Sequence, residues 1–224
     1  MAVRALVFDF DGLILDTERP VYESWRWAFA EHGCDLSVDE WASCIGTPEA
    51  WDPLDKLAAA AGVVDPAVIE RRRAVRDELL FAEAPLPGVL DLLAAARELG
   101  LPVAIASSSP RSWVTEHVER LGLGQWFVHT ACFREGVAGK PTPDLYLEAV
   151  SALGVTASEA IAFEDSAHGV AAAKAAGLWC VAVPHALTAG LDLSAADLLV
   201  DSLASVSLPA LLDQWSLPAR PVGA

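Results

Sequence analysis

Two acidic side chains that could share one reaction stand near the start of this 224-residue chain. Residues 5–8 form a short apolar run typical of a buried strand, and Asp9 and Asp11 follow it directly, before a turn at Gly12. At the carboxyl end of a strand, two acids spaced in this way can serve one pocket. They could hold a hard cation, or act as a nucleophile and a general acid/base. Taken alone, the same residues also fit a strand that merely ends in an Asp-Gly turn.

A second apolar run, residues 102–107, ends in hydroxyl side chains. Ser107, Ser108 and Ser109 precede Pro110, which is typical of the first turn of a helix. A strand followed by hydroxyls and a helix start can present side chains and backbone N–H groups to an anion. Ser109 alone would suffice as a helix cap. We therefore assign anion binding to Ser107 and Ser108.

A third apolar run, residues 160–163, is followed by Glu164 and Asp165. With Asp9 and Asp11 they would place four carboxylates at one sheet edge, which is costly unless a cation neutralises them. Oxygen ligands alone favour Mg²⁺. An acidic protein that handles phosphate also needs a fixed positive charge, and Lys140, held between Gly and Pro, is the candidate.

Strand and helix patterns alternate through most of the chain, which predicts an α/β fold with a doubly wound parallel sheet. Residues 19–82 differ, because their patterns are wholly helical, and a proline-marked connector follows them. We predict a core domain of residues 1–17 and 85–224 and a helical cap domain of residues 18–84, inserted after the first strand. The predicted helices span 21–32, 38–44, 51–61, 66–82, 89–99, 110–121, 142–153, 166–176 and 208–215; the predicted strands span 5–8, 102–107, 127–131, 160–163, 179–183 and 197–200.

Charge and composition limit the possible partners. The formal net charge of −16 opposes binding to nucleic acid or to an anionic membrane. No segment approaches the length of apolar sequence that spans a bilayer. The cysteines are spaced too widely for a metal knuckle or a redox pair, which predicts reduced thiols; they are Cys34, Cys44, Cys132 and Cys180. We expect a cytoplasmic monomer.

Taken together, these motifs resemble those of the haloacid dehalogenase (HAD) superfamily, and within it the β-phosphoglucomutase-like branch with a helical cap. The similarity covers nearly the whole chain, and any one motif alone would be weak. The resemblance implies a Rossmann-like core. The matching residues, in four motifs, are Asp9-Phe10-Asp11-Gly12 with Asp16-Thr17-Glu18; Ser107; Lys140 in Gly-Lys-Pro; and Glu164-Asp165-Ser166 with Gly169.

The resemblance also implies a role for each position. Asp9 would attack phosphorus and form an aspartyl-phosphate, and Asp11 would protonate the leaving alkoxide and then activate water. Mg²⁺ would be held by Asp9, the backbone carbonyl of Asp11 and Asp165, and Glu164 would contribute directly or through water. Phosphate oxygens would bind Ser107, the backbone N–H of Ser108, and Lys140. Residues 12–17 would form a flap beside the substrate. Thr17, at the end of this flap, and Arg111 are also assigned to substrate and phosphate binding.

Two departures favour a phosphatase over a sugar-phosphate mutase. Val21 stands where the mutases carry a His, and the loop 46–51 lacks the Arg that binds a second phosphate. Asp11, in turn, favours C–O–P chemistry over dehalogenation. The substrate would be a small phosphorylated metabolite resembling a sugar phosphate. A mutase, a dehalogenase and a non-catalytic metal-binding module remain alternatives. The expected lid contacts to the leaving group are Glu49, Trp51, Trp25 and Arg111.

Overall fold

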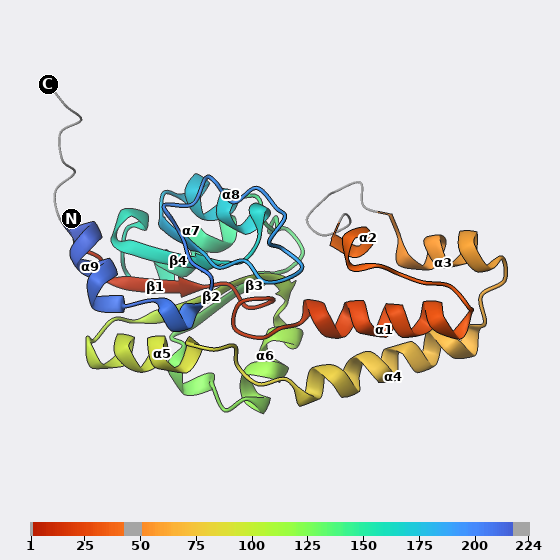
Figure 1. The fold of residues 1–224 in the computed structure, drawn as a ribbon. Coiled ribbons are helices and arrows are strands. Elements are labelled where there is room, and N and C mark those ends of the chain that lie inside the picture. The colour runs from red at the N-terminus through yellow and green to blue at the C-terminus, as the bar shows by residue number, and fades with distance from the viewer. Residues whose placement is uncertain (1, 43–50, 217–224) are drawn as a thin grey trace, which may run out of the picture.

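The computed structural model describes residues 2–42 and 51–216 (Figure 1). Its sheet has six parallel strands in the order β3-β2-β1-β4-β5-β6. The chain therefore runs outward from β1 in one direction and then in the other, and the reversal falls between β1 and β4, where α/β proteins place their ligands. The strands are β1 (Ala5–Phe8), β2 (Val103–Pro110), β3 (His129–Phe133), β4 (Ala160–Glu164), β5 (Trp179–Ala182) and β6 (Leu198–Leu199).

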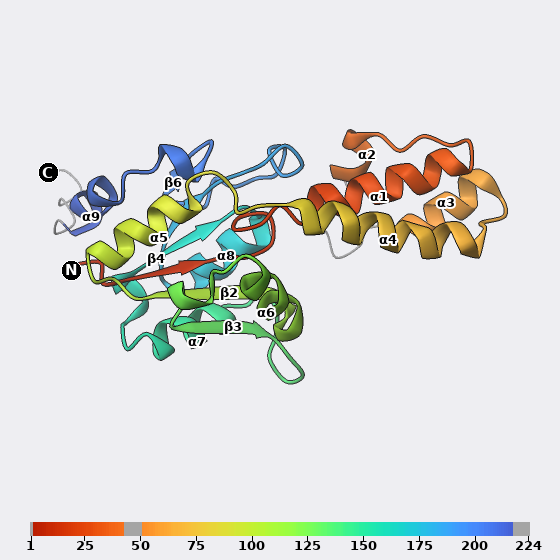
Figure 2. The same cartoon turned by 90° about the horizontal axis from the view of Figure 1, so that it is seen from below.

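Helices cover both faces of the sheet, which explains why β1 and the first four residues of β4 are apolar (Figure 2). In β1, Leu6 and Phe8 belong to one buried cluster and Ala5 and Val7 to the other. The first cluster includes side chains of α5 (Val89–Glu98), α6 (Arg111–Arg120) and α9 (Leu208–Ser216). The second includes side chains of α7 (Asp144–Ala152) and α8 (Ala167–Ala176). The predicted doubly wound α/β fold is thus confirmed.

A helical unit extends beyond the carboxyl ends of the strands, and in it α1 and α4 run side by side (Figures 1 and 2). Asp52 and Asp65 cap α3 and α4 through backbone N–H groups, and each is followed by a proline in the first helical turn. These caps explain why α4 begins where the sequence predicts. The helices are α1 (Glu18–Glu31), α2 (Val38–Ala42), α3 (Pro53–Ala61) and α4 (Pro66–Ala82).

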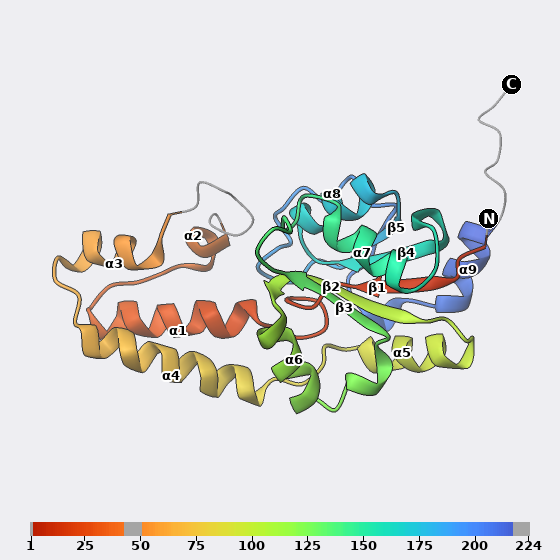
Figure 3. The ribbon, with the colours of Figure 1, turned by 180° about the vertical axis from the view of Figure 1, so that it is seen from behind.

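The chain enters and leaves the helical unit through two neighbouring segments, seen beside β1 in Figure 3. Leu15 and Pro85 form an antiparallel bridge, and Leu86 N–H donates to the carbonyl of Ile14. The segment before α1 turns sharply at Gly12, whose φ is +81°. A Cβ at Gly12 would also lie 2.4 Å from Asp165 Oδ2, so both the backbone and the available space require glycine.

Most predicted boundaries agree with the structure to within a few residues. The largest differences are of three residues: α1 begins at Glu18 instead of residue 21, and β2 runs to Pro110 instead of ending at residue 107, with an irregular register between Ser107 and Pro110. The end of the helix predicted for 38–44 and the start of loop 46–51 lie outside the described residues, as does Cys44. Cys34, Cys132 and Cys180 are free thiols. None of the described helices combines the length and the apolar character that crossing a bilayer requires.

Candidate active site

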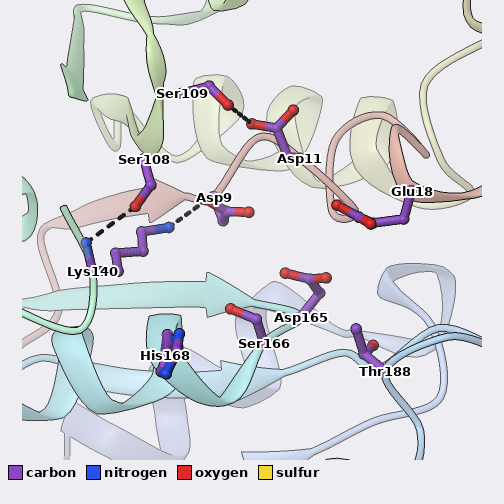
Figure 4. A pocket seen from close by; sticks show the side chains of 10 residues that line it. All are labelled: Asp9, Asp11, Glu18, Ser108, Ser109, Lys140, Asp165, Ser166, His168 and Thr188. Carbon is purple, nitrogen blue, oxygen red and sulfur yellow. Dashed lines mark hydrogen bonds and ion pairs between the residues drawn. The ribbon is translucent and has the colours of Figure 1, made fainter. Parts of the chain in front are cut away.

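A cavity of about 290 Å³ opens at the carboxyl ends of β1, β2 and β4 (Figure 4). Parallel pairing brings these ends together: Phe8 is level with Phe163, and Asp9 N–H donates to the Phe163 carbonyl at 3.0 Å. Residues far apart in sequence therefore face one space. The cavity is lined by Asp9, Asp11, Glu18, Ser108, Ser109, Lys140, Asp165, Ser166, His168 and Thr188.

Lys140 provides the positive charge at the base of this cavity. Its Nζ forms an ion pair with Asp9 Oδ1 and another, at 2.5 Å, with Glu164 Oε1. Glu164 has no exposed surface and also accepts a hydrogen bond of 2.5 Å from the Tyr146 hydroxyl. A buried carboxylate needs such partners. Glu164 thus lies beneath the cavity and links Lys140 to the sheet.

Burial controls the ionisation of this cluster. Burial raises the pKa of Asp9 well above its ordinary value; Lys140 opposes this shift, and Glu164 and Asp165 add to it. Burial also raises the pKa of Asp165. Burial would lower the pKa of Lys140, but Asp9 and Glu164 outweigh it and raise that pKa. The carboxylates thus outnumber the cation, and a further positive charge would stabilise their ionised forms.

The donor set fits a hard divalent cation. One carboxylate oxygen from each of Asp9, Glu164 and Asp165 lies within 4.8 Å of the others, and all three residues are buried. Only oxygens are offered, from two strands whose ends are fixed by the sheet, and this is the ligand chemistry that Mg²⁺ prefers.

Asp11 is held differently from Asp9. Ser107 Oγ and Ser109 Oγ donate to Asp11 Oδ2 at 3.1 and 2.7 Å, and Trp113 Nε1 donates to Oδ1 at 2.8 Å. Figure 4 shows the carboxylate turned toward Ser109 and away from Asp9 and Asp165. The two acids of the first motif therefore point to different sides of the cavity.

The structure separates the residues predicted to bind phosphate. Ser108 lines the cavity, and its Oγ accepts a 3.1 Å hydrogen bond from the backbone N–H of Lys140. Ser107 is fully buried below it, and Thr17 is buried outside the lining. The Arg111 guanidinium donates to the carbonyl of Thr130 at 2.5 Å, on strand β3. Arg111 is not among the residues that line the cavity, so its placement does not support the predicted contact with phosphate or leaving group.

The predicted lid tryptophans pack within the helical unit. The Arg72 guanidinium lies 4.3 Å from the Trp25 ring, and Trp51 makes an edge contact with Trp41. Both belong to the apolar cluster of the unit. Packing therefore accounts for these two side chains, and Glu49 lies outside the described residues.

His185 is a neighbour of the acidic cluster that the sequence analysis missed. Its Nε2 lies 3.1 Å from Asp165 Oδ2, and its Nδ1 accepts from the backbone N–H of Leu187 at 3.2 Å. Because Nδ1 accepts, the proton of the neutral ring is on Nε2 and is donated to Asp165. Leu187 packs into the cluster of the helical unit, and Thr188 lines the cavity. The position of this loop after β5 was the available signal, because β5 ends at the same sheet edge.

Glu18, at the start of α1, also faces the cavity. Burial, followed by the charges of Asp165 and Asp11, raises its pKa from 4.5 to about 7. A carboxyl group whose pKa is raised by folding stabilises the protein while protonated. That stabilisation is complete below the unfolded value and is lost as the pH rises through about 7.

We therefore expect Glu18→Gln to raise the melting temperature of the metal-free protein at about pH 8, by roughly 5 °C, and to change it little near pH 5. Thermal unfolding in chelator across this pH range measures the effect. Glu98→Gln, at the exposed end of α5, is the matched control and should leave the pH dependence unchanged. An equal shift at both pH values for Glu18→Gln would contradict the raised pKa.

Comparison with known proteins agrees with this geometry. A family model described as haloacid dehalogenase-like hydrolase matches residues 3–177. The Bacillus subtilis protein YhcW is 41% identical over 215 residues, covering 94% of this chain and 97% of that protein. A phosphorylated carbohydrates phosphatase of Thermotoga maritima is 31% identical over 195 residues, covering 84% and 88%. The chain belongs to the haloacid dehalogenase-like hydrolases, which confirms the resemblance drawn from its motifs.

A solved structure extends the comparison to a bound ligand. A mutant of CbbY from Rhodobacter sphaeroides, crystallised in complex with xylulose-(1,5)bisphosphate, is 27% identical with a TM-score of 0.69. The match covers 92% of this chain and 96% of that one.

Proposed function

We propose that the protein is a Mg²⁺-dependent phosphatase that hydrolyses a small phosphorylated metabolite, similar to a sugar phosphate, through an aspartyl-phosphate on Asp9. The observation that carries the proposal is the buried Asp9, paired with Lys140 and within reach of Glu164 and Asp165. A relative named for phosphorylated carbohydrates, and another crystallised with a sugar bisphosphate, support this substrate class.

In this mechanism a carboxylate oxygen of Asp9 attacks phosphorus, and the P–O bond to the alcohol breaks. Asp11 gives its proton to the departing alkoxide and then, as a carboxylate, takes a proton from the water that attacks the aspartyl-phosphate. Inorganic phosphate leaves and Asp9 is regenerated. Lys140 and the Ser108 backbone N–H hold phosphate oxygens during both steps.

Asp9, the backbone carbonyl of Asp11, Asp165 and Glu164 would hold Mg²⁺. When bound, the ion neutralises charge on the phosphate oxygens and favours the ionised form of Asp9. The chain's own residues supply the nucleophile, the proton donor and the fixed cation.

The helical unit, residues 18–84, would act as a cap. It lies over the sheet edge that carries the cavity, and the neighbouring segments at Leu15 and Pro85 suit a hinge. We assign to it the choice of leaving group and the exclusion of water.

Phosphate release from p-nitrophenyl phosphate tests the proposal. We expect turnover with Mg²⁺, a loss of roughly 100-fold or more in EDTA, and full recovery when Mg²⁺ is returned in excess. Activity that survives exhaustive chelation would contradict the metal requirement, and no phosphate release with Mg²⁺ would contradict the function.

A panel of sugar phosphates and other small phosphate esters would then identify the preferred leaving group. Measuring isomerised sugar phosphate beside free phosphate separates a phosphatase from a mutase. Isomerisation faster than release would favour the mutase.

A further inference from the structure

Trp113 contacts the proposed acid/base group from the first turn of α6. Its indole Nε1 donates to Asp11 Oδ1 at 2.8 Å, while Ser107 and Ser109 donate to Oδ2. Both carboxylate oxygens therefore accept hydrogen bonds from fixed elements of the core. An indole N–H is a donor only, and a carboxylate oxygen is an acceptor that suits it.

The same face of α6 continues from Trp113 to the end of the cap. His117, one turn further on, makes an edge contact with the Trp113 ring at 4.4 Å between centroids, and its Nδ1 accepts from Arg120 Nε at 3.4 Å. The Arg120 guanidinium also donates to three carbonyls at the carboxyl end of α4, where the chain returns to the core. These carbonyls belong to Leu80, Phe81 and Glu83, at 3.3, 3.0 and 3.1 Å.

The orientation of Asp11 in this arrangement bears on its role as the general acid. A general acid must reach the leaving oxygen beside Asp9, yet the Asp11 carboxylate is turned toward Ser109 and away from Asp9 (Figure 4). Protonation of an alkoxide therefore requires Asp11 to leave its three donors.

We propose that Trp113 is a positioning residue that holds Asp11 in a withdrawn orientation, and that α6 connects this hydrogen bond to the return segment of the cap. The proposal rests on the proposed function, because it assigns Asp11 the acid/base role. Because α6 contacts both Asp11 and the end of α4, a displacement of the cap can change the fraction of time that Asp11 spends in the withdrawn orientation.

Trp113→Phe removes the N–H and keeps an aromatic ring. The withdrawn orientation then loses one hydrogen bond, and Asp11 spends more time near the leaving oxygen. We expect kcat/KM for the best sugar monophosphate of the panel to rise roughly three- to tenfold. For p-nitrophenyl phosphate we expect no change, because nitrophenolate leaves without a proton and hydrolysis of the aspartyl-phosphate comes after the steps that kcat/KM reports.

Trp126→Phe is the matched control, because Trp126 packs against the same core cluster and lies under Arg97, away from the cavity. It should change neither substrate's kcat/KM. An equal fall for both substrates in Trp113→Phe would indicate a packing role and overturn the proposal. A fall confined to the sugar phosphate, or no change for either substrate, would overturn it as well.

Nuclear magnetic resonance tests the contact without turnover. The Trp113 indole N–H signal, assigned by its loss in Trp113→Phe, should move in Asp11→Ala, and also in Arg120→Gln if α6 connects the two ends. If the signal did not move in Asp11→Ala, Trp113 would not donate to Asp11 and the proposal would fail. If it did not move in Arg120→Gln, the proposed link between α6 and the cap would be wrong. A wild-type protein that releases no phosphate would defeat the proposed function, yet these spectra would still decide whether Trp113 holds Asp11.

Discussion

Replacing Asp9 with Asn is expected to lower kcat on every phosphate ester by roughly 10⁴-fold or more, because an amide oxygen does not form the aspartyl-phosphate. The substitution keeps the size of the side chain. It removes one of the two carboxylates that pair with Lys140, while Glu164 remains at 2.5 Å from the Lys140 Nζ. The lysine therefore stays compensated, and the loss falls on chemistry more than on folding.

Acid quenching during turnover, followed by mass spectrometry of the peptide that contains residue 9, measures the covalent intermediate directly. We expect one added phosphoryl group in the wild type and none in Asp9→Asn. Asp91→Asn, exposed on α5, is the matched control and should retain both activity and the modified peptide. Substantial turnover by Asp9→Asn, or a phosphoryl group on another residue, would contradict the assignment of the nucleophile.

The strands and the residues that follow them could be predicted because local patterns determine them. The apolar runs before Asp9 and Asp165 indicate buried strands, and parallel strands end at one sheet edge. This rule alone brings Asp9 and Asp165 to one site across more than 150 residues of sequence. Lys140 follows no strand directly. It is indicated by its position between Gly and Pro and by the scarcity of lysines after residue 57, where Lys174 is the only other one.

Side-chain direction on α6 could not be predicted in the same way. Arg111 and Trp113 stand two residues apart in the first turn, so they point to nearly opposite sides of the helix. The sequence does not say how α6 is rotated against the sheet. In the structure Trp113 faces Asp11 and Arg111 faces the Thr130 carbonyl on β3. Trp113, and not Arg111, is therefore the residue of this turn that contacts Asp11.

The loop after β5 was missed for a different reason. Acids or hydroxyls after a strand indicate a site at the sheet edge, but β5 is followed by Val183, Pro184 and His185. A single histidine in an oxygen site is a weak signal. Its contact with Asp165 depends on the turn at 185–188, where Thr188 Oγ1 accepts from His185 N–H at 3.0 Å. Such a turn is formed by tertiary packing as much as by local sequence.

Gly169→Ala is expected to disturb the acidic cluster by displacing the Glu164 carboxylate. Gly169 lies in the first turn of α8 and has an ordinary helical backbone, so its requirement for glycine comes from space. A Cβ there would lie about 2 Å from the Glu164 carboxylate, at 1.9 Å from Oε2 and 2.1 Å from Oε1. Glu164 cannot yield freely, because it is buried and bound by Lys140 and by the Tyr146 hydroxyl. Either α8 shifts or Glu164 leaves these partners.

Both responses lower stability, and we expect a loss of about 3 kcal/mol in the free energy of unfolding. We also expect weaker Mg²⁺ binding, because Glu164 shares the cluster with Asp9 and Asp165. Urea unfolding and calorimetric titration with Mg²⁺ measure the two effects separately. Gly124→Ala is the matched control: its φ is not positive and a Cβ there meets nothing within 4 Å, so both quantities should stay near the wild-type values. If Gly169→Ala behaved like Gly124→Ala, the Glu164 carboxylate would be able to move at little cost. That result would contradict the role of Glu164 in holding Lys140 and the metal site.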